Sequence, residues 1–205
     1  MSKDKISILK KVNGAWTSIL AVLLGLLVSV IFVTLSSNLG IFHSISLLAE
    51  SLWRGSFGTR DNLIETFVFA TPLIFTGIAH AVAFKTGLFN IGVEGQFIVG
   101  MITAALLGTL KGIPWLMHIL LVLIAGAIAG GLWASLPGYL KAKTGSNEVV
   151  NTIMMNFIAM YLSNYIVSIK KSSGSEATPL IKKNAELPRF LGGYYRINIG
   201  IFIAL

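Results

Sequence analysis

An uninterrupted apolar run near the start of the chain constrains its fold more than any other feature. Residues 17–37, TSILAVLLGLLVSVIFVTLSS, contain no charged side chain. A helix of about 20 mostly apolar residues spans the hydrocarbon core of a bilayer. Only 12% of the side chains in the whole sequence are charged, whereas soluble proteins carry about 25%. The sequence therefore predicts a membrane protein. We expect its first helix to be retained, because the run is too long for a signal peptide and lacks a clear cleavage site.

Further apolar runs follow the first one and define the expected architecture. The complete runs are 63–84, 89–110, 115–136 and 149–168. The last run, 197–205, would form only about 13 Å of helix, less than half of the bilayer core. We expect one all-α, polytopic membrane domain over 1–205 with five crossings and the start of a sixth, incomplete at its C-terminal end. The segment 38–61 is too polar to cross, and its middle, 41–53, is expected to form an amphipathic helix at the interface.

The net charge of +8 arises from basic residues that lie almost wholly between the apolar runs. Such charges flank membrane helices, so a soluble nucleic-acid-binding protein is excluded. Four lysines before the first run predict a cytoplasmic N-terminus; they are Lys3, Lys5, Lys10 and Lys11. The loop 170–196 carries six more basic residues. Five full crossings place this loop outside, whereas the positive-inside rule is better satisfied by a re-entrant third run, which charge counting alone favours.

Several classes of chemistry have no support in the sequence. The chain has no cysteine, and it contains no G-x-x-x-x-G-K-[ST], H-E-x-x-H or G-x-S-x-G motif. Its three histidines share no metal-ligand spacing; they are His43, His80 and His118. We therefore predict no catalytic residue, no metal and no cofactor.

The segment 85–96, KTGLFNIGVEGQ, combines glycines with polar side chains at the start of an apolar run. The glycines are Gly87, Gly92 and Gly95, and the polar residues are Asn90, Glu94 and Gln96. Transporters build midplane sites from broken helices of this kind. We predict that these polar side chains lie beside a substrate pathway, and that the glycines, with Pro72 in the second run, break the helices. The alternative is an ordinary turn in which Asn90 caps the next helix and Glu94 favours its dipole.

Other polar and small residues predict helix packing. Gly126 and Gly130 form a G-x-x-x-G face on the fourth run, where another helix can approach closely. Asn151 and Asn156 lie in the fifth run, and an amide in lipid needs a partner on another helix. Ser146 or Asn147 is expected to cap that helix.

Two longer strings resemble those of a known family. Residues 71–100, TPLIFTGIAHAVAFKTGLFNIGVEGQFIVG, and 141–159, KAKTGSNEVVNTIMMNFIA, resemble the permease subunits of bacterial ABC importers for nucleosides and simple sugars. The family is the ribose/branched-chain-amino-acid type, and the FNIGVEGQ string is most similar to its branch with basic-membrane-protein-type receptors. The similarity covers nearly the whole chain. Such permeases have about ten helices, so the sequence looks like their N-terminal half and a little more.

The resemblance implies a transport subunit of the bacterial cytoplasmic membrane that moves a nucleoside or simple sugar by alternating access. It implies three partners: a second permease subunit, identical or paralogous; cytoplasmic ABC ATPase subunits that hydrolyse ATP; and an extracytoplasmic substrate-binding lipoprotein. The family's sixth helix ends in the cytoplasm, which places 170–196 outside, and we expect Lys182 and Lys183 to help receive the lipoprotein. Two alternatives are a proton-coupled carrier using Glu94 and His80, and a membrane scaffold or assembly protein.

Overall fold

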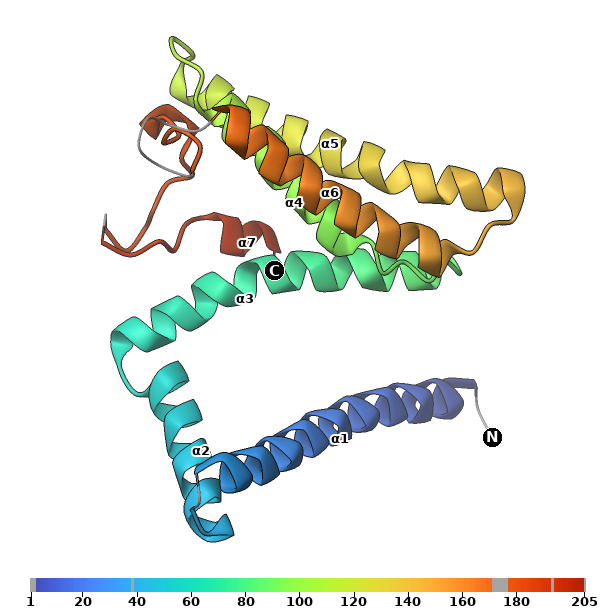
Figure 1. Cartoon of the computed structure of the whole chain (residues 1–205), viewed down its shortest axis with the longest axis vertical. Helices are drawn as coiled ribbons and strands as arrows, with labels where there is room; N and C mark the ends of the chain where they lie inside the picture. The colour runs from blue at the N-terminus through green and yellow to red at the C-terminus, as the bar shows by residue number, and fades with distance from the viewer. Residues whose placement is uncertain (1–2, 38, 171–176, 193, 205) are drawn as a thin grey trace. The chain divides into compact units, whose positions relative to one another are not determined.

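Helices form most of the chain in the computed structural model, which describes residues 3–37, 39–170, 177–192 and 194–204 (Figure 1). In chain order they are α1 (Lys3–Ser37), α2 (Ile41–Phe57), α3 (Arg60–Lys85), α4 (Val93–Gly108), α5 (Trp115–Thr144), α6 (Glu148–Lys170), the 3₁₀ turn η1 (Lys183–Ala185) and α7 (Gly200–Ala204). Within these described residues no β-strand occurs, and a single antiparallel bridge pairs Arg189 with Asn198. The predicted all-α class is confirmed.

Four of the described helices are long and apolar enough to cross a membrane. They are α1, over Trp16–Ser37, together with α3, α5 and α6. The predicted third span forms a shorter helix: α4 has 16 residues and a rise of about 24 Å, less than the roughly 30 Å of a bilayer core. It is short because the residues before Val93 are not helical. A multi-pass membrane protein is therefore confirmed, with four long spans and one shorter apolar helix.

The chain divides into two compact units, Met1–Thr66 and Phe67–Leu205. In the first unit α1 packs against α2. Ser44 of α2 is fully buried, and its hydroxyl donates a hydrogen bond to the carbonyl of Gly40 at 3.3 Å. The amphipathic segment expected at 41–53 is thus a helix, and it extends to Phe57.

In the second unit α4 packs against both α5 and α6 (Figure 1). The helices α4 and α5 approach closely because glycines face each other across their contact. A Cβ atom added at Gly100 would lie 3.1 Å from the carbonyl oxygen of Gly126. One added at Gly130 would lie 3.1 Å from the carbonyl oxygen of Gln96. The absence of side chains at these positions lets the two backbones meet.

Two helices continue through prolines. The break expected at Pro72 is not observed, because α3 runs without interruption from Arg60 to Lys85. A proline removes one backbone hydrogen bond, and the other bonds of this long helix keep it continuous. Similarly α5 passes through Pro137 and ends at Thr144 rather than near residue 136. It ends there because Gly145 adopts a left-handed conformation, with φ of 67°.

The last part of the chain is less helical than the run 197–205 suggested. Its helix, α7, covers only Gly200–Ala204, and residue 205 lies outside the described part. Residues 171–176 and 193 of the predicted loop also lie outside it. The described part of the loop 170–196 contacts the C-terminal end of α4, where the backbone N–H of Lys182 donates to the carbonyl of Gly108 at 2.8 Å.

Candidate functional site

The break between α3 and α4 covers residues 86–92, which we call the break segment. It begins because Gly87 has φ of 79°, a left-handed conformation that ends a helix and suits glycine. The N–H of Leu88 then donates to the carbonyl of Ala83 at 3.1 Å, which closes the end of α3. The chain is therefore not helical over 86–92, which agrees both with the predicted break and with the alternative of an ordinary turn between two helices.

Side chains of α6 hold the break segment in place. Asn156 accepts a hydrogen bond from the backbone N–H of Gly95 at 2.8 Å, and its Nδ2 donates to the carbonyl of Ile91 at 2.9 Å. The N–H of Ile91 donates to Thr152 Oγ1 at 3.2 Å. Thr152 and Asn156 are one helical turn apart, so a single face of α6 supplies all three bonds. These bonds satisfy backbone groups that lack partners at a helix start.

Asn90 and Gln96 meet at the start of α4. The Oδ1 atom of Asn90 accepts the backbone N–H of Gly92 at 2.8 Å and lies 3.4 Å from Nε2 of Gln96. Gly92, rather than Asn90, occupies the cap position of α4. The Asn90 side chain therefore shapes the turn before the helix, and both amides remain partly accessible.

A cavity of about 380 Å³ lies beside this amide pair. Its polar lining comes from Asn90, Gln96, Glu148 and Thr152, and most of the remaining lining is apolar; the other lining residues are Ala79, Val82, Ala83, Leu88, Phe89, Ala134, Pro137 and Gly138. The Phe89 ring stacks on that of Phe84, with centroids 5.2 Å apart. The cavity thus combines an aromatic ring, neutral amides and aliphatic surface.

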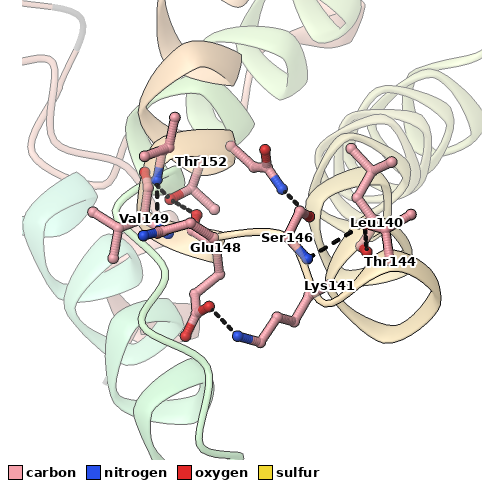
Figure 2. Close-up of polar contacts among 10 residues, drawn as sticks. Leu140, Lys141, Thr144, Ser146, Glu148, Val149 and Thr152 are labelled. Carbon is pink, nitrogen blue, oxygen red and sulfur yellow. Dashed lines mark hydrogen bonds and ion pairs between the residues drawn. The ribbon is translucent and has the colours of Figure 1, made fainter.

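Figure 2 shows the polar contacts of the turn between α5 and α6, beside Glu148 of the cavity lining. Lys141 of α5 pairs with Glu148, the first residue of α6, at 2.5 Å. The Oδ1 atom of Asn147 accepts the N–H of Val149 at 2.9 Å, so the predicted cap of this helix is confirmed. Asn151 donates to Ser146 Oγ at 2.7 Å, which places its side chain at the turn.

A second cavity, of about 550 Å³, lies along α3, α4 and α5. Gly100, Gly126 and Gly130 form part of its wall, and Gln96 and Ala79 line both cavities. The two cavities therefore adjoin at Gln96. Both cavities are mostly apolar, and the Gln96 amide adds a polar group to each of them.

The structure brings some of the predicted pathway residues together and separates others. Asn90 and Gln96 line the 380 Å³ cavity, whereas Glu94 is exposed and is not among its lining residues. Glu94 lies in the first turn of α4, where a carboxylate is favoured by the helix dipole. The sequence did not single out Thr152 or Glu148. Thr152 could have been found from its spacing, because it lies four residues before Asn156 in an apolar run and so shares a helix face with it.

The chemistry of the site suits binding rather than catalysis. In the part of the chain that the structure describes, no group of three or more histidine, aspartate or glutamate side chains is placed to hold a metal. Asn90 and Gln96 offer neutral donors and acceptors, which bind hydroxyl, amide and ring-nitrogen groups without a charge requirement. Phe89 adds a flat apolar surface. Because the charge of Glu148 in the lining is paired with Lys141, an uncharged polar molecule of moderate size fits this combination.

Comparison with known proteins gives a consistent result. The family model described as branched-chain amino acid transport system / permease component matches residues 62–204. The guanosine ABC transporter permease NupP of Bacillus subtilis is 38% identical over 200 residues, covering 96% of this chain and 56% of that protein. The nucleoside ABC transporter permease NupB of Lactococcus lactis is 34% identical over 167 residues, covering 76% and 46%.

A sugar permease is also similar. The glucose ABC transporter permease TsgB13 of Haloferax volcanii is 32% identical over 121 residues, covering 59% of this chain and 32% of that protein. The chain spans about half the length of the first two relatives. No solved structure matches it.

Proposed function

The chain belongs to the family described as branched-chain amino acid transport system / permease component, and on that premise we propose that it contributes to the membrane-spanning subunit of an ATP-driven importer. Its substrate is a nucleoside or a simple sugar. The printed names of similar permeases support this substrate class, since they specify guanosine, nucleosides and glucose. All three are uncharged molecules with several hydrogen-bonding groups.

The 380 Å³ cavity beside the break segment is the observation that carries this proposal. A pathway through a membrane needs polar groups that replace water around the substrate, and the helix break supplies them at Asn90 and Gln96. A cavity of this volume falls within the range of small-molecule sites, about 300–1,000 Å³. We assign Asn90 and Gln96 to the substrate pathway, and Glu94 to the same polar start of α4.

The glycines have a different role in the proposed mechanism. Gly92 allows the break segment, and Gly95 the first turn of α4, to lie directly against α6: a Cβ at Gly92 would lie 3.1 Å from Thr152 Cβ, and one at Gly95 would lie 2.9 Å from Asn156 Oδ1. Gly87 supplies the left-handed turn at the end of α3. These positions are where the segment bends during alternating access, while Pro72 makes α3 easier to bend. The Gly126 and Gly130 face keeps α5 fixed against α4.

Transport requires partners that hydrolyse ATP and deliver substrate. We propose cytoplasmic ABC ATPases, a second permease subunit and an extracytoplasmic substrate-binding lipoprotein as these partners. The four lysines before the first apolar run support a cytoplasmic N-terminus. With α1, α3, α4, α5 and α6 alternating in direction, the break segment and the turn between α5 and α6 then face the cytoplasm.

The test is uptake by a bacterium that lacks its own nucleoside transport. The gene for this chain is expressed with its chromosomal neighbours, and entry of tritiated guanosine and of labelled glucose is measured. Uptake of either substrate should depend on the neighbouring ATPase and stop when the P-loop lysine of that ATPase is replaced. Uptake that does not depend on the ATPase but is abolished by a protonophore would instead identify a proton-coupled carrier. Absence of uptake of any nucleoside or sugar would reject the proposal.

A further inference from the structure

A second polar feature lies at the opposite end of α4 from the break segment. Here the turn 109–114, the first turn of α5 and residues 182–184 enclose a space of about 250 Å³, which we call the basic cavity. It is lined by Leu110, Lys111, Gly112, Ile113, His118, Lys182, Lys183 and Asn184. Three of these residues are lysines, and none of them is acidic.

Specific contacts bring the three lysines together from distant parts of the chain. The N–H of Lys182 donates to the carbonyl of Gly108 at 2.8 Å, and Nδ2 of Asn184 donates to the carbonyl of Ile113 at 3.1 Å. Ile181 packs against Gly108, where an added Cβ would lie 2.9 Å from its Cγ2 atom. The segment 181–184 is therefore fixed on the turn that carries Lys111. These backbone contacts therefore place Lys111, Lys182 and Lys183 around the same cavity.

The positive charge in the basic cavity has no counter-charge among the described residues. Lys111, Lys182 and Lys183 form none of the ion pairs there, and the acid nearest in sequence, Glu186, pairs with Arg189 at 3.1 Å. The N-terminus of α5 adds a partial positive charge. Three lysines that line one small space, beside the positive end of a helix, favour an anion there.

His118 lies at the buried side of the basic cavity and fixes its shape. Only 1% of this side chain is exposed, and its Nε2 lies 3.0 Å from the carbonyl of Leu107. Because a carbonyl oxygen only accepts, Nε2 carries the proton in this bond. The ring therefore fixes the first turn of α5 against the end of α4, so that the lysines surround a space of defined shape.

We propose that the basic cavity binds a phosphate group at the membrane surface. A phosphate is small enough for this space, and lysine ammonium groups bind it as point charges. The candidate span that contains His118 begins at Trp115, four residues after Lys111, which places the cavity at the boundary of the bilayer. Phospholipid headgroups lie at that level, and their phosphate groups can pair with lysine side chains there. Free phosphate offers the same chemistry from the aqueous side.

The sequence alone suggested another partner for Lys182 and Lys183, an extracytoplasmic binding protein. The geometry favours the phosphate, because these lysines line a cavity together with Lys111 and the buried His118. A protein docks more readily on side chains that project from a surface. A bound anionic lipid also gives two of the six basic residues of this loop, Lys182 and Lys183, a role at the membrane surface.

The proposal is tested by thermal unfolding of the full purified chain in nanodiscs. Discs of phosphatidylcholine are compared with discs that contain phosphatidylglycerol, and inorganic phosphate is titrated separately into the phosphatidylcholine discs. The test variant replaces all three lysines, as K111Q/K182Q/K183Q. A matched control removes the same charge elsewhere, as K85Q/K143Q/K170Q, and K111R/K182R/K183R restores the charge within the cavity.

We expect phosphatidylglycerol to raise the unfolding temperature of the wild type, the control and the arginine variant. The glutamine variant should lose most of this rise, since each lysine near an anionic surface changes affinity by about fivefold.

Stabilisation by phosphatidylglycerol alone assigns the site to a lipid, and stabilisation by inorganic phosphate as well assigns it to phosphate from either source. An equal rise in the glutamine and control variants, or no rise with any anion, would overturn the proposal. The proposal would also be overturned if phosphatidylglycerol still raised the unfolding temperature of the glutamine variant while that variant no longer bound the substrate-binding lipoprotein. None of these results depends on transport activity.

Discussion

The Asn156 side chain binds the backbone on both sides of Gly92 through its two amide atoms. Its Oδ1 accepts the N–H of Gly95 at 2.8 Å, and its Nδ2 donates to the carbonyl of Ile91 at 2.9 Å. A helix start leaves backbone N–H groups such as that of Gly95 without partners within the helix. One asparagine of α6 thereby allows a broken helix to exist at this position.

Replacement of Asn156 by leucine should destabilise the protein. The substitution keeps the volume of the side chain but leaves the N–H of buried Gly95 unpaired, which costs about 1–3 kcal/mol in unfolding free energy. Asn156→Asp retains the acceptor and should lose less. The measurement is reversible unfolding in detergent micelles, followed by circular dichroism.

Asn164 provides the control for this prediction. It lies on the same helix, its side chain is exposed, and no hydrogen bond of this side chain occurs among the described residues. Asn164→Leu should therefore leave the unfolding free energy unchanged or raise it. Equal losses for the substitutions at 156 and 164 would show that the contacts of Asn156 do not stabilise the break segment.

Gly130 and Gly131 are neighbours in sequence that should respond oppositely to alanine. A Cβ at Gly130 would lie 3.1 Å from the carbonyl oxygen of Gln96, whereas one at Gly131 meets nothing within 4 Å. Gly130→Ala should force α5 away from α4 and lower the unfolding free energy by about 1–3 kcal/mol. Gly131→Ala should leave it unchanged or raise it by up to about 1 kcal/mol, because alanine favours a helix over glycine. Thermal unfolding of the two variants, measured in parallel, tests this prediction. Similar losses of unfolding free energy in both would contradict the close approach of α4 and α5.

The ion pair between Lys141 and Glu148 should order the turn that joins α5 to α6. Both side chains are partly exposed, so we expect a local effect that high salt weakens. Lys141→Gln should speed hydrogen exchange of the amides at 145–148, and the exchanged pair K141E/E148K should restore protection. Lys143→Gln removes the same charge from the same helix end without touching the pair. If it speeds exchange as much as Lys141→Gln, general charge rather than the pair orders the turn.

The helices could be predicted from the sequence because their signal is local. Runs such as 17–37 are uncharged over a length that only a membrane helix requires, and four of the five long runs form long helices in the structure. The cap at Asn147 was predictable for the same reason, since a cap acts within three residues. Polar residues beside glycines likewise indicated the break before α4.

The pairing of distant residues could not be predicted in this way. Thr152 and Asn156 bind backbone groups 61 to 65 positions earlier in the chain, and no periodicity encodes that distance. The continuation of α5 through Pro137 depends on the turn that follows it, where Gly145 and the pair with Glu148 place the helix end. The basic cavity arises because the segment around Lys182 folds back onto the end of α4.

The account's central claim is that Gln96 lies on the route of the substrate, and cysteine labelling tests this most directly. The natural chain contains no cysteine, so Gln96→Cys introduces a single thiol. A matched control is Leu132→Cys, because Leu132 is exposed on α5 and lines neither cavity. Both variants are assembled with the transporter's other subunits and treated with a membrane-impermeant thiol reagent in open membrane vesicles.

We predict that the thiol at position 96 reacts, that the one at 132 does not, and that a saturating transported nucleoside or sugar slows the reaction at 96 several-fold. No reaction at 96, or a rate that the transported substrate leaves unchanged, would contradict the claim.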